Sequence, residues 1–202
     1  MAKGIHEGLA EPLTFSTDES TKRKKGAHKP VFAKVFVEAD VPYTQTNRIH
    51  LLVNPFAGKK KGREVAKKVI EAANKAGVEI TCSYSSYSGH LITMASALVV
   101  DENDLIAVVG GDGSFSEVLT GRMLLGKSEK ETFAIVPAGT GNSQAHDLGI
   151  GSVQEAIETM LTGKKQALDL ARVELTEGLP GATGDPCVRY SHNLVTWGLG
   201  VD

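Results

Sequence analysis

The sequence predicts an α/β fold in which helices cover both faces of a parallel sheet, followed by the first strands of a second, β-rich unit. From residue 49 onward, short β-branched and apolar runs alternate with segments whose apolar residues recur at helical spacing. This alternation is typical of parallel strands joined by right-handed crossovers. The unbroken apolar run Leu105–Val109 indicates a strand that such a sheet buries on both faces.

Length and composition fit one such domain with additional segments. The 202 residues are 41% hydrophobic and 23% charged, which provides enough apolar material for a core. The net charge is -2, so a phosphate-bearing ligand must be held by local geometry, and we expect no nucleic-acid partner. The sequence has two cysteines, no apolar run of the ~18 residues needed to span a bilayer, and no secretory segment. These features predict a cytoplasmic protein.

Residues 1–47 are expected to form a mobile tail and an extra strand. Residues 1–30 hold few large apolar side chains, and their basic cluster at 22–25 favours a solvated tail over contact with nucleic acid or an anionic membrane. The run 31–38 is rich in β-branched and aromatic residues, and Pro42 ends it. Two alternatives remain for this strand: an added edge strand, or the remnant of a preceding domain.

Residues 48–163 are expected to form the α/β domain, of Rossmann-like three-layer type. Two helix starts resemble capping boxes, Ser114 to Glu117 and Ser152 to Glu155, so Glu117 is expected to cap its own helix. Gly77 and Gly163 are natural helix stops. In chain order, the expected elements are a strand at 49–53, a helix through 65–73, a strand at 78–84, a helix through 91–98, a strand at 105–109, a helix from 114, a strand at 133–136 and a helix from 153.

From residue 164 the alternation of strands and helices stops, and residues 164–202 predict the start of a β-rich domain. Ala167–Leu175 and Val188–Thr196 are expected to be strands, joined by a Gly/Pro-rich loop with no helix between them. Antiparallel pairing is the simplest outcome for such a pair. The residues up to Asp202 are too few to complete a second domain, so we expect it to be truncated here.

The strongest local motif is the glycine loop Gly110–Ser114, which directly follows the strand at 105–109. Its three glycines allow a sharp turn and a close approach of a ligand to the backbone, and the N-terminus of the following helix suits phosphate. Asp112 places a carboxylate in this loop, where it would serve Mg²⁺ or a substrate hydroxyl. The alternative is a tight strand-to-helix turn without a ligand.

Two further loops have the same character. Pro137–Ser143 follows the strand at 133–136, and Asn54–Gly58 follows the first strand of the domain and leads into three lysines. Such loops at neighbouring strand ends predict a crevice at the carboxyl edge of the sheet. Neither the P-loop pattern nor the Gly-x-Gly-x-x-Gly dinucleotide pattern occurs, and no His/Cys spacing predicts a metal centre.

Taken together, Leu-Leu-Val-Asn-Pro with Gly58 and Lys59, then Gly-Gly-Asp-Gly-Ser, then Pro-Ala-Gly-Thr-Gly-Asn resemble the diacylglycerol kinase catalytic-domain superfamily. The resemblance covers about residues 48 to 202 and corresponds to the N-terminal, nucleotide-binding half of that domain. The segment Leu194–Asp202, with its Trp-Gly pair, is similar to the opening of the lipid-binding domain in the sphingosine and ceramide kinase branch.

This resemblance implies an ATP-dependent lipid kinase domain that uses ATP and Mg²⁺ and phosphorylates a sphingoid-type or diacylglycerol-type lipid. It implies that Asp112 activates the lipid hydroxyl, that Asp202 faces the lipid head group, and that the protein makes peripheral contact with membranes. Phe56 stands where the sphingosine kinases carry an Arg, so one phosphate contact is in doubt. The residues implied to contact nucleotide are Asn54, Ser85, Gly111, Gly113, Ser114, Gly139, Thr140, Gly141 and Asn142.

Two other functions stay open on the sequence. An NAD kinase-like enzyme would share the Gly-Gly-Asp-Gly loop, although Pro-Ala-Gly-Thr-Gly-Asn argues against it. A non-catalytic nucleotide-binding module would fit a chain without a complete second domain. His50 and His192 lie in strand-like runs and are interpreted as packed or edge residues. The oligomeric state and the identity of the lipid are not determined by the sequence.

Overall fold

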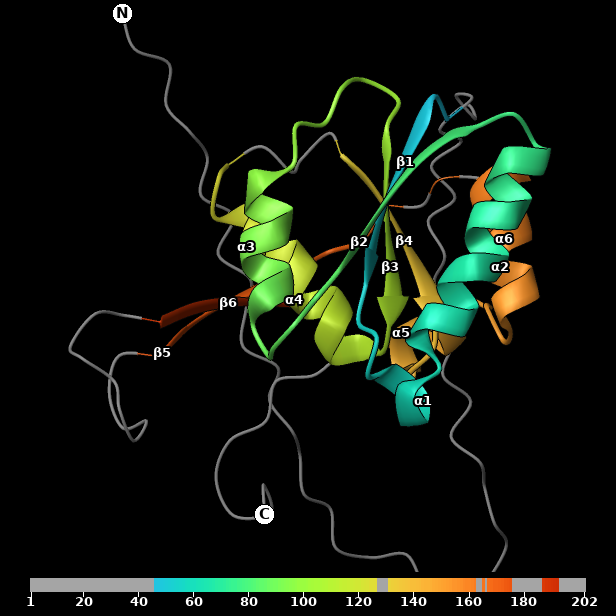
Figure 1. The fold of residues 1–202 in the computed structure, drawn as a ribbon. Coiled ribbons are helices and arrows are strands. Elements are labelled where there is room, and N and C mark those ends of the chain that lie inside the picture. Colours follow the sequence, from blue (N-terminus) through green and yellow to red (C-terminus); the bar gives the residue numbers. More distant parts are fainter. Residues whose placement is uncertain (1–45, 127–130, 163–164, 166, 176–186, 193–202) are drawn as a thin grey trace, which may run out of the picture. The chain divides into compact units, whose positions relative to one another are not determined.

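The computed structural model describes residues 46–126, 131–162, 165, 167–175 and 187–192. Four parallel strands form one sheet in the order β2-β1-β3-β4 (Figure 1). The expected parallel α/β fold is therefore confirmed. The strands are β1 (Arg48–Val53), β2 (Glu79–Tyr84), β3 (Leu105–Gly110) and β4 (Thr132–Pro137).

Helices lie on both faces of this sheet, which gives the expected three layers. In Figure 1, α2 and α6 lie on one side of the sheet, and α3 and α4 lie on the other. These faces follow from the strand order, because a right-handed crossover from β1 to β2 and one from β2 to β3 run in opposite directions. The helices are α1 (Ala57–Lys60), α2 (Gly62–Lys75), α3 (His90–Ala97), α4 (Asp112–Met123), α5 (Ser143–Asp147) and α6 (Val153–Thr162).

The core lies between the sheet and its two helical layers. All six residues of β3 are buried, as the unbroken apolar run predicts, whereas exposed and half-buried residues alternate along the edge strand β2. The helix α2 buries Val65, Ala66, Val69 and Ala73, and it ends before Gly77, whose φ of 72° is the left-handed conformation expected at a helix stop.

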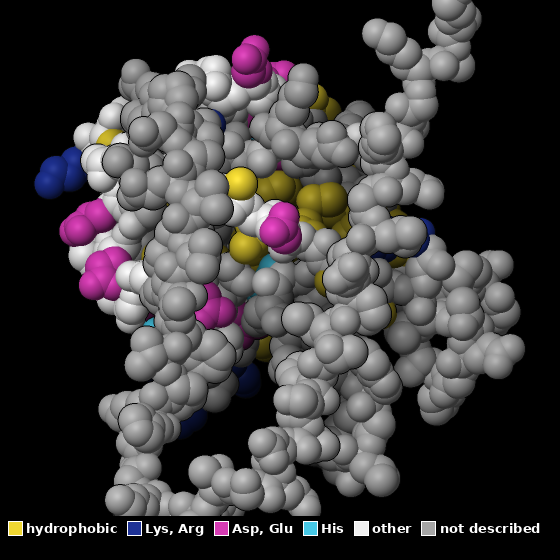
Figure 2. All heavy atoms as spheres, turned by 180° about the vertical axis from the view of Figure 1, so that it is seen from behind, with side chains coloured by type: hydrophobic (Ala, Val, Ile, Leu, Met, Phe, Trp, Pro, Cys, Tyr) yellow, Lys and Arg dark blue, Asp and Glu magenta, His cyan; other side chains and the backbone are white. Residues whose placement is uncertain are grey.

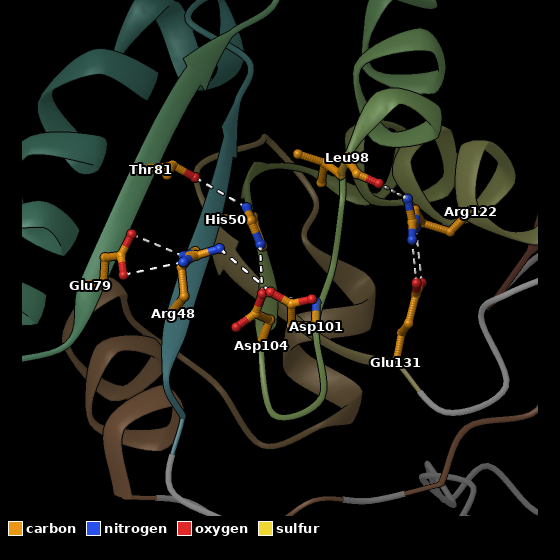
Figure 3. A network of polar contacts seen from close by, with 9 residues as sticks. All are labelled: Arg48, His50, Glu79, Thr81, Leu98, Asp101, Asp104, Arg122 and Glu131. Atoms are coloured by element: carbon orange, nitrogen blue, oxygen red, sulfur yellow. Dashed lines mark hydrogen bonds and ion pairs between the residues drawn. The ribbon is translucent and has the colours of Figure 1, made fainter.

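The amino ends of the strands are held by polar contacts (Figure 3). His50 on β1 lies 3.0 Å from Asp104 Oδ2 and 3.2 Å from Thr81 Oγ1, and both His50 and Asp104 are buried. The interpretation of His50 as a packed residue is therefore confirmed. Arg48 donates to Glu79 across the β1–β2 pair at 3.0 Å.

A buried ion pair closes the opposite side of the same edge. Arg122, near the end of α4, is paired through its guanidinium with Glu131, just before β4. The same guanidinium donates to the backbone oxygen of Ala95 at 2.9 Å and to that of Leu98 at 2.9 Å, the latter drawn in Figure 3. Arg122 is only 2% exposed, so these four acceptors satisfy a charge that has no access to water.

The predicted capping boxes have different outcomes. At α6, Ser152 Oγ accepts from the backbone N–H of Glu155 at 3.1 Å, as expected. At α4 the prediction is wrong, because the helix begins at Asp112 and has no side-chain cap. Glu117 does not cap its own helix; its carboxylate accepts from the backbone N–H groups of Gly89 and Leu91, and so caps α3. The glycine loop leads directly into α4, which leaves Ser114 inside the first turn.

The strands β5 (Ala171–Leu175) and β6 (Cys187–Ser191) pair antiparallel, as predicted. They are shorter than expected: residues 167–170 precede the first strand without belonging to it. Backbone and side-chain hydrogen bonds join β6 to α4, where Ser116 Oγ donates to Tyr190 O at 2.7 Å. The predicted strand at 31–38, the tail and Asp202 lie outside the described residues.

Candidate functional site

Three loops meet at the carboxyl edge of the sheet, after β1, β3 and β4. After the neighbouring strands β1 and β3, the chain turns toward opposite faces of the sheet. Ligand sites in such folds usually lie at this position. Asn54, directly after β1, donates through its backbone N–H to Val109 O at 2.9 Å and through Nδ2 to Ser114 Oγ at 3.1 Å. Asn54 therefore fixes the glycine loop to the neighbouring strand.

The loops after β3 and β4 are in direct backbone contact. Ala138 N–H donates to Gly110 O at 2.8 Å. A Cβ on Gly139 would lie 2.6 Å from Gly111 Cα, which is closer than side-chain carbons approach backbone. Gly139 therefore allows the two loops to touch, and a Cβ on Gly111, 3.1 Å from Gly139 Cα, would force them slightly apart.

Asn142 closes the loop that follows β4. Its Oδ1 accepts from Gly139 N–H at 2.8 Å, and its Nδ2 donates to Gly139 O at 3.0 Å. The backbone of Asn142 has φ 53°, a conformation that Asn tolerates better than most residues. The structure therefore gives Asn142 a clear role in shaping the loop.

Asp112 joins the two glycine loops from the side of α4. Its Oδ2 accepts from Ser143 N–H at 2.9 Å, and its Oδ1 accepts from Gln144 N–H at 2.8 Å. Both carboxylate oxygens thus bind the first backbone N–H groups of α5, where a negative charge is favoured. The sequence reasoning missed this contact, because residues 112 and 144 are separated by 32 positions with no local pattern between them.

One face of this assembly is open to a ligand. Among the described residues, a Cβ added to Gly113 would meet no atom within 4 Å, and Thr140 and Gly141 are exposed. Ser85 is buried at the end of β2, where its N–H donates to Val53 O at 2.9 Å. The structure brings all the sequence-predicted residues from Asn54 to Asn142 to this one edge of the sheet.

His192, which the sequence analysis interpreted as a packed or edge residue and did not assign to the site, also lies at this edge. Its Nδ1 lies 2.7 Å from Gln144 Oε1, and its Nε2 lies 3.3 Å from Asp112 O. The ring also packs edge-on against Phe115, with centroids 5.0 Å apart. Burial lowers the pKa of His192 below its usual value, although the hydrogen bond to Asp112 and its negative charge act in the opposite direction. No sequence signal marks this residue, because it lies 80 positions from Asp112.

Among the described side chains visible in Figure 2, Asp and Glu lie at several separate places on this face, with hydrophobic side chains visible between some of them. Within the described ranges, no group of three His, Cys, Asp or Glu residues could hold a metal ion. None of the helices described is long and apolar enough to cross a membrane. A hollow of about 650 Å³ lies at the amino edge, but its lining includes Arg122, Glu131 and Asp104, which are already paired.

The fold and the three loops define an α/β domain with a candidate ligand site at the carboxyl edge of its parallel sheet, and comparison with known sequences gives the family. Residues 48–173 match the diacylglycerol kinase catalytic domain, and the chain belongs to this family. The resemblance seen in the glycine motifs is confirmed by this match.

Individual relatives include both diacylglycerol and sphingosine kinases. The chain is 28% identical to the diacylglycerol kinase of Bacillus subtilis over 128 residues, which are 62% of this chain and 42% of the relative. It is 30% identical to sphingosine kinase 2 of Arabidopsis thaliana over 166 residues, which are 77% of this chain and 32% of the relative. The chain therefore spans less than half the length of these relatives.

A solved structure is similar in fold. The crystal structure of a diacylglycerol kinase from Bacillus anthracis superposes with a TM-score of 0.52 at 25% sequence identity, covering 65% of this chain and 46% of that one. Fold and sequence comparisons thus agree on the same family.

Proposed function

We propose that this chain is the nucleotide-binding half of a lipid kinase, which transfers the γ-phosphoryl group of MgATP to a lipid hydroxyl. One observation carries the proposal: in a member of the diacylglycerol kinase family, three loops are joined into one surface with an open face at Gly113. Asn54 and Ser114 are hydrogen-bonded across the first two loops, and Gly111 touches Gly139 across the second and third.

Phosphate groups would bind at this open face. The N-terminus of the 12-residue helix α4 points its free backbone N–H groups toward the loop, and the absence of a side chain at Gly113 leaves room for an anion. Asn54, Ser85, Ser114, Thr140, Gly141 and Asn142 would line the nucleotide. Magnesium would arrive with the phosphates of ATP and supply charge neutralisation during transfer.

Asp112 is proposed as the group that accepts the proton of the lipid hydroxyl. A carboxylate has further acceptor positions beyond the two N–H groups of Ser143 and Gln144, so both roles are compatible. The demand on this base is modest, because phosphoryl transfer depends chiefly on positioning and charge neutralisation. The lipid would be a sphingoid-type or diacylglycerol-type alcohol, and Asp202 would contribute to its binding.

The domain division belongs to the same proposal. Residues 48–163 would form the nucleotide-binding domain, and residues 164–202 would begin the β-rich lipid domain. The hairpin of β5 and β6 supports this division, since it has antiparallel pairing and is separate from the main sheet. Peripheral contact with a membrane would follow from the lipid substrate.

A non-catalytic nucleotide-binding module is the second candidate. It is favoured by the engagement of both Asp112 oxygens in holding α5. Family membership favours a lipid kinase over an NAD kinase-like enzyme. Phosphate transfer to a lipid would exclude the module, and nucleotide binding without any transfer would support it.

Calorimetric titration of the chain with MgATP tests the site. Gly113→Val is expected to lower the affinity at least about tenfold, because its Cβ and methyl groups would occupy the open face. Ala97→Val, at the exposed end of α3, is the control for added bulk and should bind as the unchanged chain does. Absence of MgATP binding, or equal affinity of Gly113→Val and the unchanged chain, would contradict the assignment.

A further inference from the structure

The hairpin that follows the α/β domain is docked along one stripe of α4. Asp112, Ser116 and Thr120 are spaced four residues apart, so they share one face of the helix. Tyr190 N–H donates to Thr120 Oγ1 at 3.1 Å, Ser116 Oγ donates to Tyr190 O at 2.7 Å, and His192 meets Asp112 O.

The spacing of the two elements explains why these contacts form a row. Four residues of helix rise about 6 Å, and two residues of strand rise about 6.6 Å. The step from Tyr190 to His192 therefore matches the step from Ser116 to Asp112. Tyr190 itself contacts both Thr120 and Ser116, through its own N–H and its own carbonyl oxygen. The last contact of the row is made by His192 at the start of the helix, next to the glycine loop.

His192 completes a closed ring of polar contacts with Asp112 and Gln144. The Asp112 carboxylate accepts from Gln144 N–H at 2.8 Å, the Gln144 side chain lies 2.7 Å from His192 Nδ1, and His192 Nε2 lies 3.3 Å from Asp112 O. A carbonyl oxygen can only accept, so Nε2 carries a proton in the last contact. In the neutral ring Nδ1 is then an acceptor, and the Gln144 amide donates to it when its oxygen and nitrogen exchange places, which leaves the positions of the side-chain atoms unchanged. Gln144 is 2% exposed, and few water molecules could replace the ring nitrogen as its partner.

We propose that His192 is a positioning residue for Asp112, and that the β5–β6 hairpin fixes the candidate catalytic carboxylate through it. Loss of the His192 contact frees the Gln144 side chain and loosens the first turn of α5, whose N–H groups orient the carboxylate. The importance of that orientation for phosphoryl transfer rests on the proposed function. The hairpin thus belongs to the active edge of the sheet and does more than begin the next domain.

Amide hydrogen exchange of the 202-residue chain tests the positioning without requiring activity. His192→Leu removes both polar contacts while keeping an apolar side chain against Phe115. We expect it to speed exchange of the Ser143 and Gln144 amides at least about tenfold, with amides of α2 unchanged. His192→Asn keeps a polar atom opposite Gln144 and should restore protection to within about threefold of the unchanged chain.

Two further variants make the outcome specific. Ser116→Ala removes a hydrogen bond of the same row without touching the ring of contacts, and should leave exchange of α5 unchanged. Gln144→Met removes the other partner of His192, and should loosen α5 as His192→Leu does, even if the latter folds poorly. Equal protection of the α5 amides in Gln144→Met and the unchanged chain would overturn the proposal.

Nucleotide binding separates this inference from the proposed function. If MgATP does not bind, the proposed function fails, but the exchange experiment still decides whether His192 positions α5. If MgATP binds and the α5 amides stay protected without the His192 contact, the proposed function stands and the positioning role falls.

Discussion

Glu117 on α4 caps a different helix, since its Oε1 accepts from the backbone N–H of Gly89 at 3.0 Å. Its Oε2 accepts from Leu91 N–H at 3.3 Å, so one carboxylate serves two of the free N–H groups at the start of α3. The contact joins the two helices that cover one face of the sheet. It also holds the loop between Ser85 and α3, next to the candidate site.

Glu117→Gln should therefore destabilise the protein. The amide keeps one acceptor oxygen but loses the negative charge at the helix N-terminus, and the loss of a cap costs about 0.5–2 kcal/mol. Glu158→Gln is the matched control, because Glu158 is exposed on α6 and its carboxylate accepts from Gln154 Nε2 on the same helix at 2.9 Å. Urea unfolding of both variants measures the difference, and equal midpoints would refute the capping role.

Gly58→Ala should destabilise more than Gly77→Ala. Both glycines have positive φ, 53° and 72°, so either alanine is strained by about 1–2 kcal/mol. At Gly58 the added Cβ would also lie 2.1 Å from Ala138 O, whereas at Gly77 it would meet no atom of the described part of the chain within 4 Å. We expect a total loss of roughly 2–5 kcal/mol at Gly58 from strain and overpacking. Thermal unfolding of the two variants measures these losses of stability. Equal losses would show that the loop after β1 does not pack against the loop after β4 as described.

Asp112→Asn should loosen the first turn of α5 and slow phosphoryl transfer to the lipid. Only one oxygen of the amide can accept from the N–H groups of Ser143 and Gln144, so the α5 amides should exchange faster. If Asp112 is the general base, the rate of lipid phosphorylation should fall by about 10²–10⁴. Asp147→Asn is the control for the loss of a negative charge, because Asp147 is exposed at the end of α5. Unchanged transfer by Asp112→Asn would remove Asp112 from the mechanism and leave it a structural residue.

Arg122→Met should be among the most damaging substitutions away from the site. It leaves the Glu131 carboxylate, with its side chain only 11% exposed, without its partner, and breaking a buried pair costs about 3–5 kcal/mol. Adding Glu131→Leu should recover part of this loss, because no unpaired charge then remains. Arg48→Met removes a more exposed pair with Glu79 and should cost far less. A double variant no more stable than Arg122→Met would argue against this account.

Much of the fold could be predicted from the sequence, because it depends on patterns of neighbouring residues. The buried run Leu105–Val109, the amphipathic helix ending before Gly77 and the cap at Ser152 are all local signals, and each is confirmed. The meeting of the glycine loops could be predicted as well, since the carboxyl ends of parallel strands share one edge of a sheet. The capping box at Ser114 failed because the glycine loop itself starts the helix there.

The sequence by itself determined the four parallel strands, the helices α2, α3, α4 and α6, and the edge where the glycine loops gather, because periodic apolar residues and glycines constrain the backbone locally. Only the tertiary structure decided which partners the polar side chains take. Glu117 caps α3 across 28 positions, Asp112 caps α5 across 32, and His192 reaches Asp112 across 80. Such contacts depend on the packing of whole elements against one another, and no spacing of residues along the chain encodes them.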